Sequence, residues 1–247
     1  MKNDFLLQDK SILVTGASSG IGREIAIQTA ALGARVILVG RSVERLKETR
    51  DLMNHGEHLE IIADLTDSTQ HQSIITGRKF DGVVFNAGIV EYAPIRFVSS
   101  EKIQKLFDTN FTSAVVLCQQ LLKGKHVNKE GSLVFISSIS SKLGVAGTAL
   151  YASSKAALSA FAKVAASEVS SQRIRSNSVS PGIIITPMTG KAETIRSKEK
   201  MDEEEKLYPL GYGSTKDVAN LVSFLLSDAS KWITGNDIKI DGGLTLN

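Results

Sequence analysis

Short runs of apolar residues recur along the chain, and most are followed by a longer segment with helical periodicity. The runs that we interpret as strands are 11–15, 34–40, 58–63, 81–85, 132–137, 175–180 and 236–240. Most of them are almost continuously apolar, which is typical of parallel strands covered on both faces. The segments with apolar residues at helical spacing are 21–32, 42–54, 99–123, 151–170 and 215–227. This alternation predicts parallel βαβ units in a single doubly wound α/β domain, residues 1–247.

Two segments depart from the alternation. Residues 65–80 leave room for only a short crossover between strands. Residues 183–214 form an irregular insertion with a charge run after a late strand. Because ligands enter at the carboxyl ends of parallel strands, we expect 183–214 to be a mobile lid over the substrate.

Composition narrows the class of protein. The chain has 247 residues, 42% of them hydrophobic, and a formal net charge of +3. The apolar fraction is sufficient for a full core, and so small a charge excess does not indicate nucleic-acid binding. No segment predicts a membrane span or a secretory signal, and one cysteine cannot form an intrachain disulfide. We expect a cytoplasmic protein without a nucleic-acid or membrane partner, and without a metal site.

The segment TGASSGIG, residues 15–22, follows the first strand and opens the first helix. Its glycines allow a tight turn, close approach to a pyrophosphate and close helix–strand packing. The amides and the dipole at a helix start favour a bound anion. In this context a dinucleotide-binding turn is favoured over a plain glycine-rich turn. Its residues are Gly16, Ser18, Ser19, Gly20, Ile21 and Gly22.

The end of the second strand indicates which dinucleotide binds. A fold that prefers NAD usually has a carboxylate there to bind the ribose 2′-hydroxyl. This strand instead ends Val39-Gly40-Arg41, and the guanidinium of Arg41 can pair with a 2′-phosphate. We therefore favour NADP(H) over NAD(H), with a solvated Arg41 at a helix start as the alternative.

Tyr151 and Lys155 lie four residues apart at the start of a predicted helix, on one helical face. A tyrosine ordinarily titrates near about 10, so we expect the Lys155 ammonium to lower the pKa of Tyr151. Ser138 ends an earlier strand, where its hydroxyl can bind a substrate carbonyl oxygen. Any one of these residues alone would be read as a surface contact, but together they favour catalysis.

The motifs occur in the order that is typical of short-chain dehydrogenases/reductases. They are TGASSGIG, ADL (63–65), NAG (86–88), Asn110 in FDTNF, Ser138, YASSK (151–155), PG (181–182), Thr186 and TGNDIKIDGG. From about residue 10 to its C-terminus, the chain resembles this family. The resemblance implies a Rossmann-type, seven-stranded parallel sheet flanked by helices on both faces. It also implies a catalytic tetrad of Asn110, Ser138, Tyr151 and Lys155.

The same resemblance implies a role for each tetrad residue. Tyr151 would donate the proton to a carbonyl oxygen, which Ser138 orients and polarises. Lys155 would hold the nicotinamide ribose, and Asn110 would anchor a water that passes protons to Lys155. The cofactor itself carries the difficult step, while the protein positions and tunes it.

The resemblance also assigns further cofactor contacts. Asp64 would bind the adenine amine, with a backbone contact from Leu65. Asn86, Ala87 and Gly88 would border the adenine ribose, whereas Pro181, Gly182 and Thr186 would close over the nicotinamide end. The chain departs from the family pattern at Phe85, where an asparagine is frequent and where we expect a buried strand residue, and in its short 65–80 crossover.

The substrate is the least determined feature. Overall length, the N-terminus and the closing DGG look most like 3-oxoacyl-[acyl-carrier-protein] reductases. We predict an NADPH-dependent carbonyl reductase, with an acyl-carrier-protein thioester or a small carbonyl compound as substrate. The alternatives are a dehydrogenase of a sugar, polyol, steroid or other secondary alcohol, and a non-catalytic NADP-sensing protein.

Two expectations concern surfaces. One group of basic residues is either a solvated rim or a docking surface for an acidic carrier protein: Lys123, Lys125, Lys129, Arg173 and Arg175. The resemblance and the long apolar segments 99–123 and 151–170 predict a homotetramer.

Overall fold

The computed structural model describes residues 3–186 and 198–246, and its strands form one parallel sheet. The strand order is β3-β2-β1-β4-β5-β6-β7. The strands are β1 (Ser11–Thr15), β2 (Arg35–Gly40), β3 (Leu59–Ile62), β4 (Phe80–Phe85), β5 (Val127–Ile136), β6 (Arg175–Pro181) and β7 (Asp237–Ile240). The order reverses between β1 and β4, which is the switch point where doubly wound sheets bind ligands. The predicted seven-stranded fold is confirmed.

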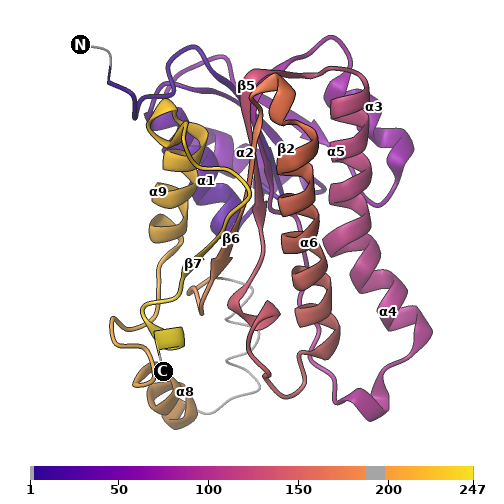
Figure 1. Ribbon diagram of the computed structural model, residues 1–247, viewed down its shortest axis with the longest axis vertical. Coiled ribbons are helices and arrows are strands. Elements are labelled where there is room, and N and C mark those ends of the chain that lie inside the picture. The colour runs from indigo at the N-terminus through magenta and orange to yellow at the C-terminus, as the bar shows by residue number, and fades with distance from the viewer. Residues whose placement is uncertain (1–2, 187–197, 247) are drawn as a thin grey trace.

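Helices cover both faces of the sheet in two layers (Figure 1). One layer contains α1 (Gly20–Ala31), α2 (Val43–Asp51) and α9 (Thr215–Leu226). The other contains α3 (His71–Ile75), α4 (Ser100–Phe107), α5 (Ser113–Lys123) and α6 (Ala149–Glu168). No helix in the described ranges has the length and apolarity needed to cross a membrane.

Central strands bury side chains on both faces, which explains their continuous apolar sequences. In β1, Ile12 and Val14 join the core beneath α1 and α9, while Leu13 joins the core beneath α5 and α6. Phe85 is buried at the end of β4, and its ring stacks on Phe135 with centroids 4.4 Å apart. The expectation that Phe85 is a buried strand residue is therefore confirmed.

Two elements differ from the sequence-based expectation. The segment 99–123 is not one regular helix, because a π-helical turn at Asp108–Thr112 separates α4 from α5. Strand β5 begins at Val127, which pairs with Phe80 ahead of a bulge, and not at 132. The crossover at 65–80 is short, as predicted, and contains only α3 and a single 3-10 turn.

The described parts of the expected insertion, 183–186 and 198–214, follow the carboxyl end of β6 in the chain. They contain α8 (Lys198–Glu205), which Figure 1 shows at the lower end of the molecule. Residues 187–197 lie outside the described part of the chain. That 183–214 forms a mobile lid over the substrate stays a prediction.

Candidate active site

The glycine-rich turn at residues 15–22, called the glycine turn below, contacts the residues that follow β4. Gly16 and Gly20 have φ of +66° and +56°, a region that glycine occupies without strain. A Cβ on Gly16 would lie 2.8 Å from Nδ2 of Asn86. That Nδ2 donates to the Thr15 carbonyl oxygen at 3.0 Å, so the turn and Asn86 are fixed together.

Side chains behind the turn hold its carbonyl groups. The Thr49 hydroxyl donates to the Ala17 carbonyl at 2.9 Å, and Arg23 Nη2 donates to the Ser18 carbonyl at 2.8 Å. Ser19 precedes α1 but makes no side-chain cap, so the first amides of α1 remain available to a ligand anion. Sequence analysis missed Arg23 and Thr49 because their contacts depend on how α1 and α2 pack.

One cavity of about 450 Å³ joins the glycine turn to the start of α6. It is lined by all the expected cofactor-binding residues except Gly22. Gly22 packs behind the turn, where a Cβ would overlap the Gly16 carbonyl oxygen. This is the helix–strand packing role expected of that glycine, so Gly22 shapes the site without facing the cavity.

Two arginines lie at the end of the cavity formed by β2 and β3. The Arg41 side chain is 71% exposed, and its Nη1 lies 4.0 Å from Oδ2 of Asp64. Hydrogen bonds from Thr66 hold the pKa of Asp64 below its ordinary value. Arg45, in the first turn of α2, lines the same cavity and was missed, although its place just after the second strand was a usable signal.

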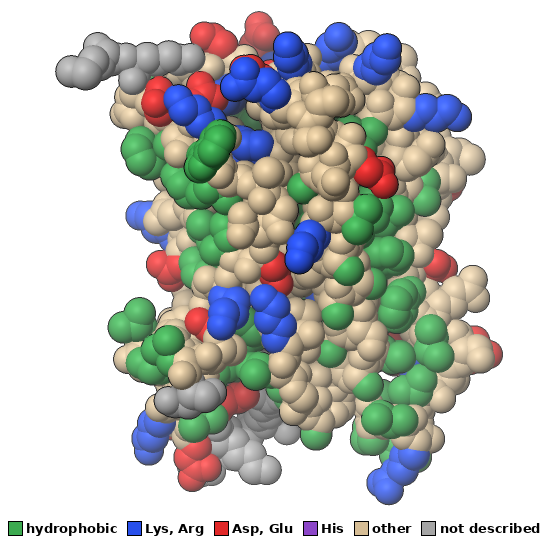
Figure 2. Space-filling view, viewed as in Figure 1, with side chains coloured by type: hydrophobic (Ala, Val, Ile, Leu, Met, Phe, Trp, Pro, Cys, Tyr) green, Lys and Arg blue, Asp and Glu red, His purple; other side chains and the backbone are tan. Residues whose placement is uncertain are grey.

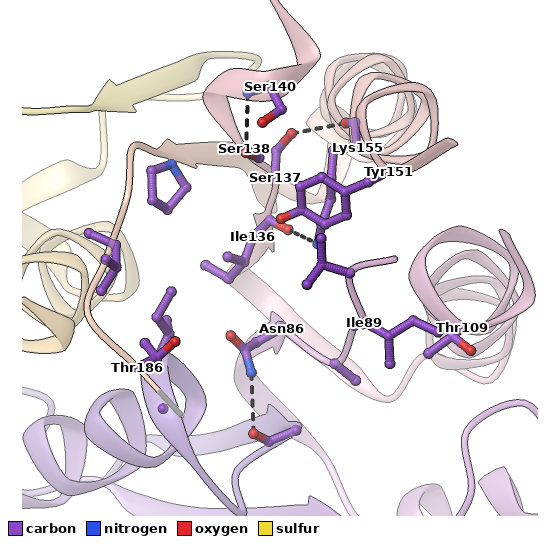
Figure 3. A pocket seen from close by; sticks show the side chains of 18 of the residues that line it. Asn86, Ile89, Thr109, Ile136, Ser137, Ser138, Ser140, Tyr151, Lys155 and Thr186 are labelled. Atoms are coloured by element: carbon purple, nitrogen blue, oxygen red, sulfur yellow. Dashed lines mark hydrogen bonds between the residues drawn. The ribbon is translucent and has the colours of Figure 1, made fainter. Parts of the chain in front are cut away.

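Tyr151, Lys155 and Ser138 converge at the other end of the cavity, as Figure 3 shows. Ser138 follows β5 and hydrogen-bonds Tyr151 through their side chains. The Lys155 Nζ lies 5.9 Å from the centroid of the Tyr151 ring and donates to the Ile136 carbonyl at 2.7 Å. Three of the four expected catalytic residues therefore meet in one site.

The electrostatics differ from the expected pairing of Tyr151 with Lys155. Burial raises the pKa of Tyr151 to about 12, although the hydrogen bond with Ser138 opposes the rise. Burial also lowers the pKa of Lys155 to about 8. The pKa of Tyr151 is therefore raised, and not lowered as we expected from the neighbouring Lys155. The Lys155 Nζ donates to the Ile136 carbonyl, and loss of hydration on burial is the largest cause of the raised pKa of Tyr151.

Asn110 stands behind the cavity and does not line it. Its side chain is fully buried in the π-helical turn. Its Oδ1 accepts from the Ile89 amide at 2.8 Å, and its Nδ2 donates to the Ile89 carbonyl at 2.9 Å and to Ser154 Oγ at 3.1 Å. Both N–H groups are therefore used, so Asn110 positions the segment after β4. The expected role of Asn110 in anchoring a water for Lys155 stays a prediction.

The basic residues considered as a docking surface do not border this cavity. Arg175 is buried and donates to the Leu225 and Ser227 carbonyls, so it is not part of any surface. Lys123 and Arg173 lie where α5 and α6 end, opposite the cavity (Figure 1). Figure 2 shows Lys and Arg side chains gathered at this upper end.

The cavity wall beyond Tyr151 is mainly apolar. Its aliphatic and aromatic members are Tyr92, Ile139, Leu143, Val145, Ile183, Ile184, Tyr208 and Leu244. Tyr208 is itself fixed, because its hydroxyl accepts from the Ile183 amide at 3.3 Å. Glu204 also lines the cavity, whose other charged side chains among the described residues are Arg41, Arg45, Asp64 and Lys155.

Known proteins resemble the chain over its whole length. The model of a family described as enoyl-(acyl carrier protein) reductase matches residues 16–245. The 3-oxoacyl-[acyl-carrier-protein] reductase FabG of Rickettsia felis is 35% identical over 242 residues, covering 97% of this chain and 98% of that protein. The L-xylulose reductase of Caenorhabditis elegans is 32% identical, with 100% of both chains covered.

Solved structures extend the likeness to three dimensions. A short-chain type dehydrogenase/reductase from Mycobacterium marinum has a TM-score of 0.89 at 30% identity, covering 99% of this chain and 98% of its own. An Agrobacterium tumefaciens protein, provisionally assigned as a 2-deoxy-D-gluconate 3-dehydrogenase, was solved with bound NADP. It has a TM-score of 0.91 at 28% identity, and each chain is covered completely.

Proposed function

The chain belongs to the short-chain dehydrogenase/reductase family of oxidoreductases acting on CH–OH and C=O groups, and we propose that it reduces a ketone with NADPH. The observation that carries the proposal is one cavity that contains Ser138, Tyr151 and Lys155 at one end and Arg41 at the other. We treat residues 1–247 as a single domain whose 183–214 insertion covers the substrate.

The described residues fit a nicotinamide dinucleotide. Gly20 and the uncapped start of α1 leave space and amides for a pyrophosphate. Lys155 uses one of its three N–H donors on Ile136, which leaves two for ribose hydroxyls. Arg41 and Arg45 offer two guanidinium groups to a 2′-phosphate, which favours NADP(H) over NAD(H). When bound, the cofactor supplies the hydride that reaches the carbonyl carbon.

Tyr151 supplies the proton for the carbonyl oxygen, and Ser138 orients the carbonyl group. Because the pKa of Tyr151 is about 12, its hydroxyl is protonated at neutral pH and can donate to the carbonyl oxygen. The Ser138 hydroxyl polarises the same oxygen. The phenolate left on Tyr151 is stabilised by the Lys155 ammonium, which is charged below pH 8. A non-catalytic NADP sensor would not require this arrangement.

The apolar wall favours a 3-oxoacyl thioester, whose chain can pack on Ile139, Leu143 and Ile184. The similarity to the Rickettsia felis reductase supports this choice. Glu204 would repel the carboxylate of a sugar acid, although the hydroxyls of Tyr92 and Tyr208 could serve a neutral sugar or polyol. The relative named L-xylulose reductase keeps that second candidate open.

A substrate panel tests this proposal. Purified protein is supplied with NADPH or NADH and with an acetoacetyl thioester, xylulose, gluconate-type ketones and a steroid ketone. We expect the thioester with NADPH to give the highest kcat/KM. Faster turnover of a sugar would keep the reaction and replace the substrate, whereas NADPH binding with no turnover would favour the sensor.

We also propose that the protein forms a homotetramer. Ile103 on α4 and Val164 on α6 are exposed apolar side chains. Figure 2 shows apolar side chains along the right-hand side of the molecule, where Figure 1 places α4, α5 and α6. Such faces are typical of subunit contacts. Mass photometry should give four times the monomer mass, and a monomer throughout the accessible concentration range would contradict the proposal.

A further inference from the structure

The turn that carries Ser138 is internally bonded. The Ser140 amide donates to Ser138 Oγ at 3.2 Å, and Ser141 Oγ donates to the Ser138 carbonyl at 2.7 Å. The Lys142 amide closes the turn by donating to the Ile139 carbonyl at 2.8 Å. Because these bonds link consecutive residues, a group that holds Lys142 also restrains Ser138.

Lys142 is held by an ion pair with the first residue of β7. Its Nζ lies 2.8 Å from Oδ2 of Asp237, and the Asp237 side chain is only 18% exposed. The other carboxylate oxygen accepts from Ser180 Oγ at 2.6 Å. Burial alone would raise the pKa of Asp237, but the ion pair with Lys142 and the hydrogen bond from Ser180 bring it below its ordinary value. The carboxylate is therefore charged at neutral pH.

Asp237 thereby joins two walls of the cavity without lining it. Ile139 and Leu143, on either side of the turn, face the cavity. Ser180 is followed directly by Pro181 and Gly182, which line the cavity from β6. One carboxylate thus binds both the Ser138 turn and the strand that leads to the second wall.

We propose that Lys142 and Asp237 form a positioning pair for the carbonyl substrate. The pair sets the separation between the Ser138 turn and the Pro181–Gly182 segment, and it touches no substrate atom. This inference rests on the proposed reductase function. The pair is bonded directly to the Ser138 turn, whereas Arg41 and the glycine turn, which carry most of the expected cofactor contacts, lie at the other end of the cavity, so its loss acts mainly on substrate binding.

Three variants separate this role from a general effect of charge. Lys142→Met removes the charge and keeps an apolar stem, and Lys142→Arg keeps the charge. Lys79→Met is the matched control, because Lys79 is exposed before β4 at the opposite end of the sheet. We expect Lys142→Met to raise the KM for the carbonyl substrate about fivefold, as for a partly exposed ion pair. The kcat of Lys142→Met and its Kd for NADPH should stay within about twofold of the wild-type values. In Lys142→Arg and Lys79→Met, the KM, the kcat and the Kd for NADPH should all stay within about twofold of wild type.

A double-mutant cycle assigns the effect to the pair itself. If the two residues act together, Lys142→Met with Asp237→Asn should raise KM no more than the larger single effect. Additive effects, an unchanged KM in Lys142→Met, or an equal loss of NADPH affinity would each overturn the inference.

Hydrogen exchange tests the pair independently of activity. In Lys142→Met, the amides of Ser140 through Leu143 should exchange several-fold faster than in wild type, while those of α1 and β1 are unchanged. Unchanged exchange in the turn would overturn the inference. A wild-type protein that reduces no carbonyl compound would instead refute the proposed function, and the exchange data would still decide whether the pair restrains the turn.

Discussion

Asn110 reaches α6 through Ser154, whose hydroxyl accepts from Asn110 Nδ2 at 3.1 Å and donates to the Tyr151 carbonyl at 2.8 Å. The same amide side chain holds both backbone polar groups of Ile89. The π-helical turn therefore connects the segment after β4 to the helix that carries Tyr151 and Lys155. This contact network, rather than contact with a ligand, is the function that the structure gives to the Asn110 side chain.

Asn110→Ala should destabilise the protein and slow the reaction together. The change leaves the Ile89 N–H and C=O without their partner, and each buried unpaired group costs roughly 1–3 kcal/mol. Urea unfolding should show a loss of about 2 kcal/mol or more, and kcat should fall in the same variant. A matched change at Thr109→Ala, in the same turn, removes only a bond to the Lys105 carbonyl and should cost less. A variant of wild-type stability would show that the Ile89 bonds contribute little.

The rate of reduction should depend on the ionisation of Lys155. Its pKa is lowered to about 8 by burial, so the ammonium that stabilises the Tyr151 phenolate is lost as pH rises through 8. Tyr151, with a pKa of about 12, stays protonated over this range. We expect kcat/KM for reduction to fall above about pH 8, measured at constant ionic strength. A profile that is flat to the ordinary lysine pKa would contradict this assignment.

The free energy of unfolding should also vary with pH because of Lys155. Burial lowers the folded-state pKa of Lys155 below 10.5, so between 8 and 10.5 the unfolded chain binds a proton that the folded chain does not. The free energy of unfolding therefore rises with pH in this window. Relative to Lys155→Met, wild type should gain on the order of 3 kcal/mol between pH 7 and 10.5, measured by chemical denaturation. A constant difference between the two proteins would mean that Lys155 titrates normally.

Arg41→Ala should weaken NADPH much more than NADH. A hydrogen bond to a charged group contributes roughly 1.5–3 kcal/mol, which corresponds to a KM increase of about tenfold to a hundredfold. The effect should be specific because only NADPH carries a 2′-phosphate. Lys47→Ala is the control, since Lys47 lies on α2 and pairs with Asp51 outside the cavity. Equal effects on both cofactors would show that Arg41 does not bind the 2′-phosphate.

The strands and helices, and the side chains that take part in the reaction, could be predicted because short segments of sequence determine both. The strands are apolar on both faces, as at Ile12, Leu13 and Val14, and the glycine turn directly follows one of them. Tyr151 and Lys155 are one helical turn apart, so their proximity follows from helix geometry. Arg45 lies in the first turn of α2, directly after β2, so its place near Arg41 could also have been predicted.

Features that depend on tertiary contacts could not be predicted. The π-helical turn at Asp108–Thr112 lies where Asn110 inserts beside Ile89, and periodicity alone gave a continuous helix. The pKa of Tyr151 depends mainly on loss of hydration in the folded protein, which the sequence spacing of Tyr151 and Lys155 does not reveal. Lys142 and Asp237 are far apart in sequence and meet only because β7 adds to the sheet beside β6.

The most direct test of the account is NADPH oxidation by wild type and by Tyr151→Phe, with an acetoacetyl thioester as substrate. Phenylalanine keeps the aromatic ring and removes the hydroxyl proton that the carbonyl oxygen requires. Fluorescence titration of both proteins controls for NADPH binding. The account predicts turnover in wild type, its loss in Tyr151→Phe by about a hundredfold or more, and an NADPH Kd within about twofold of wild type. Turnover that persists in the variant would contradict the central claim that Tyr151 is the proton donor.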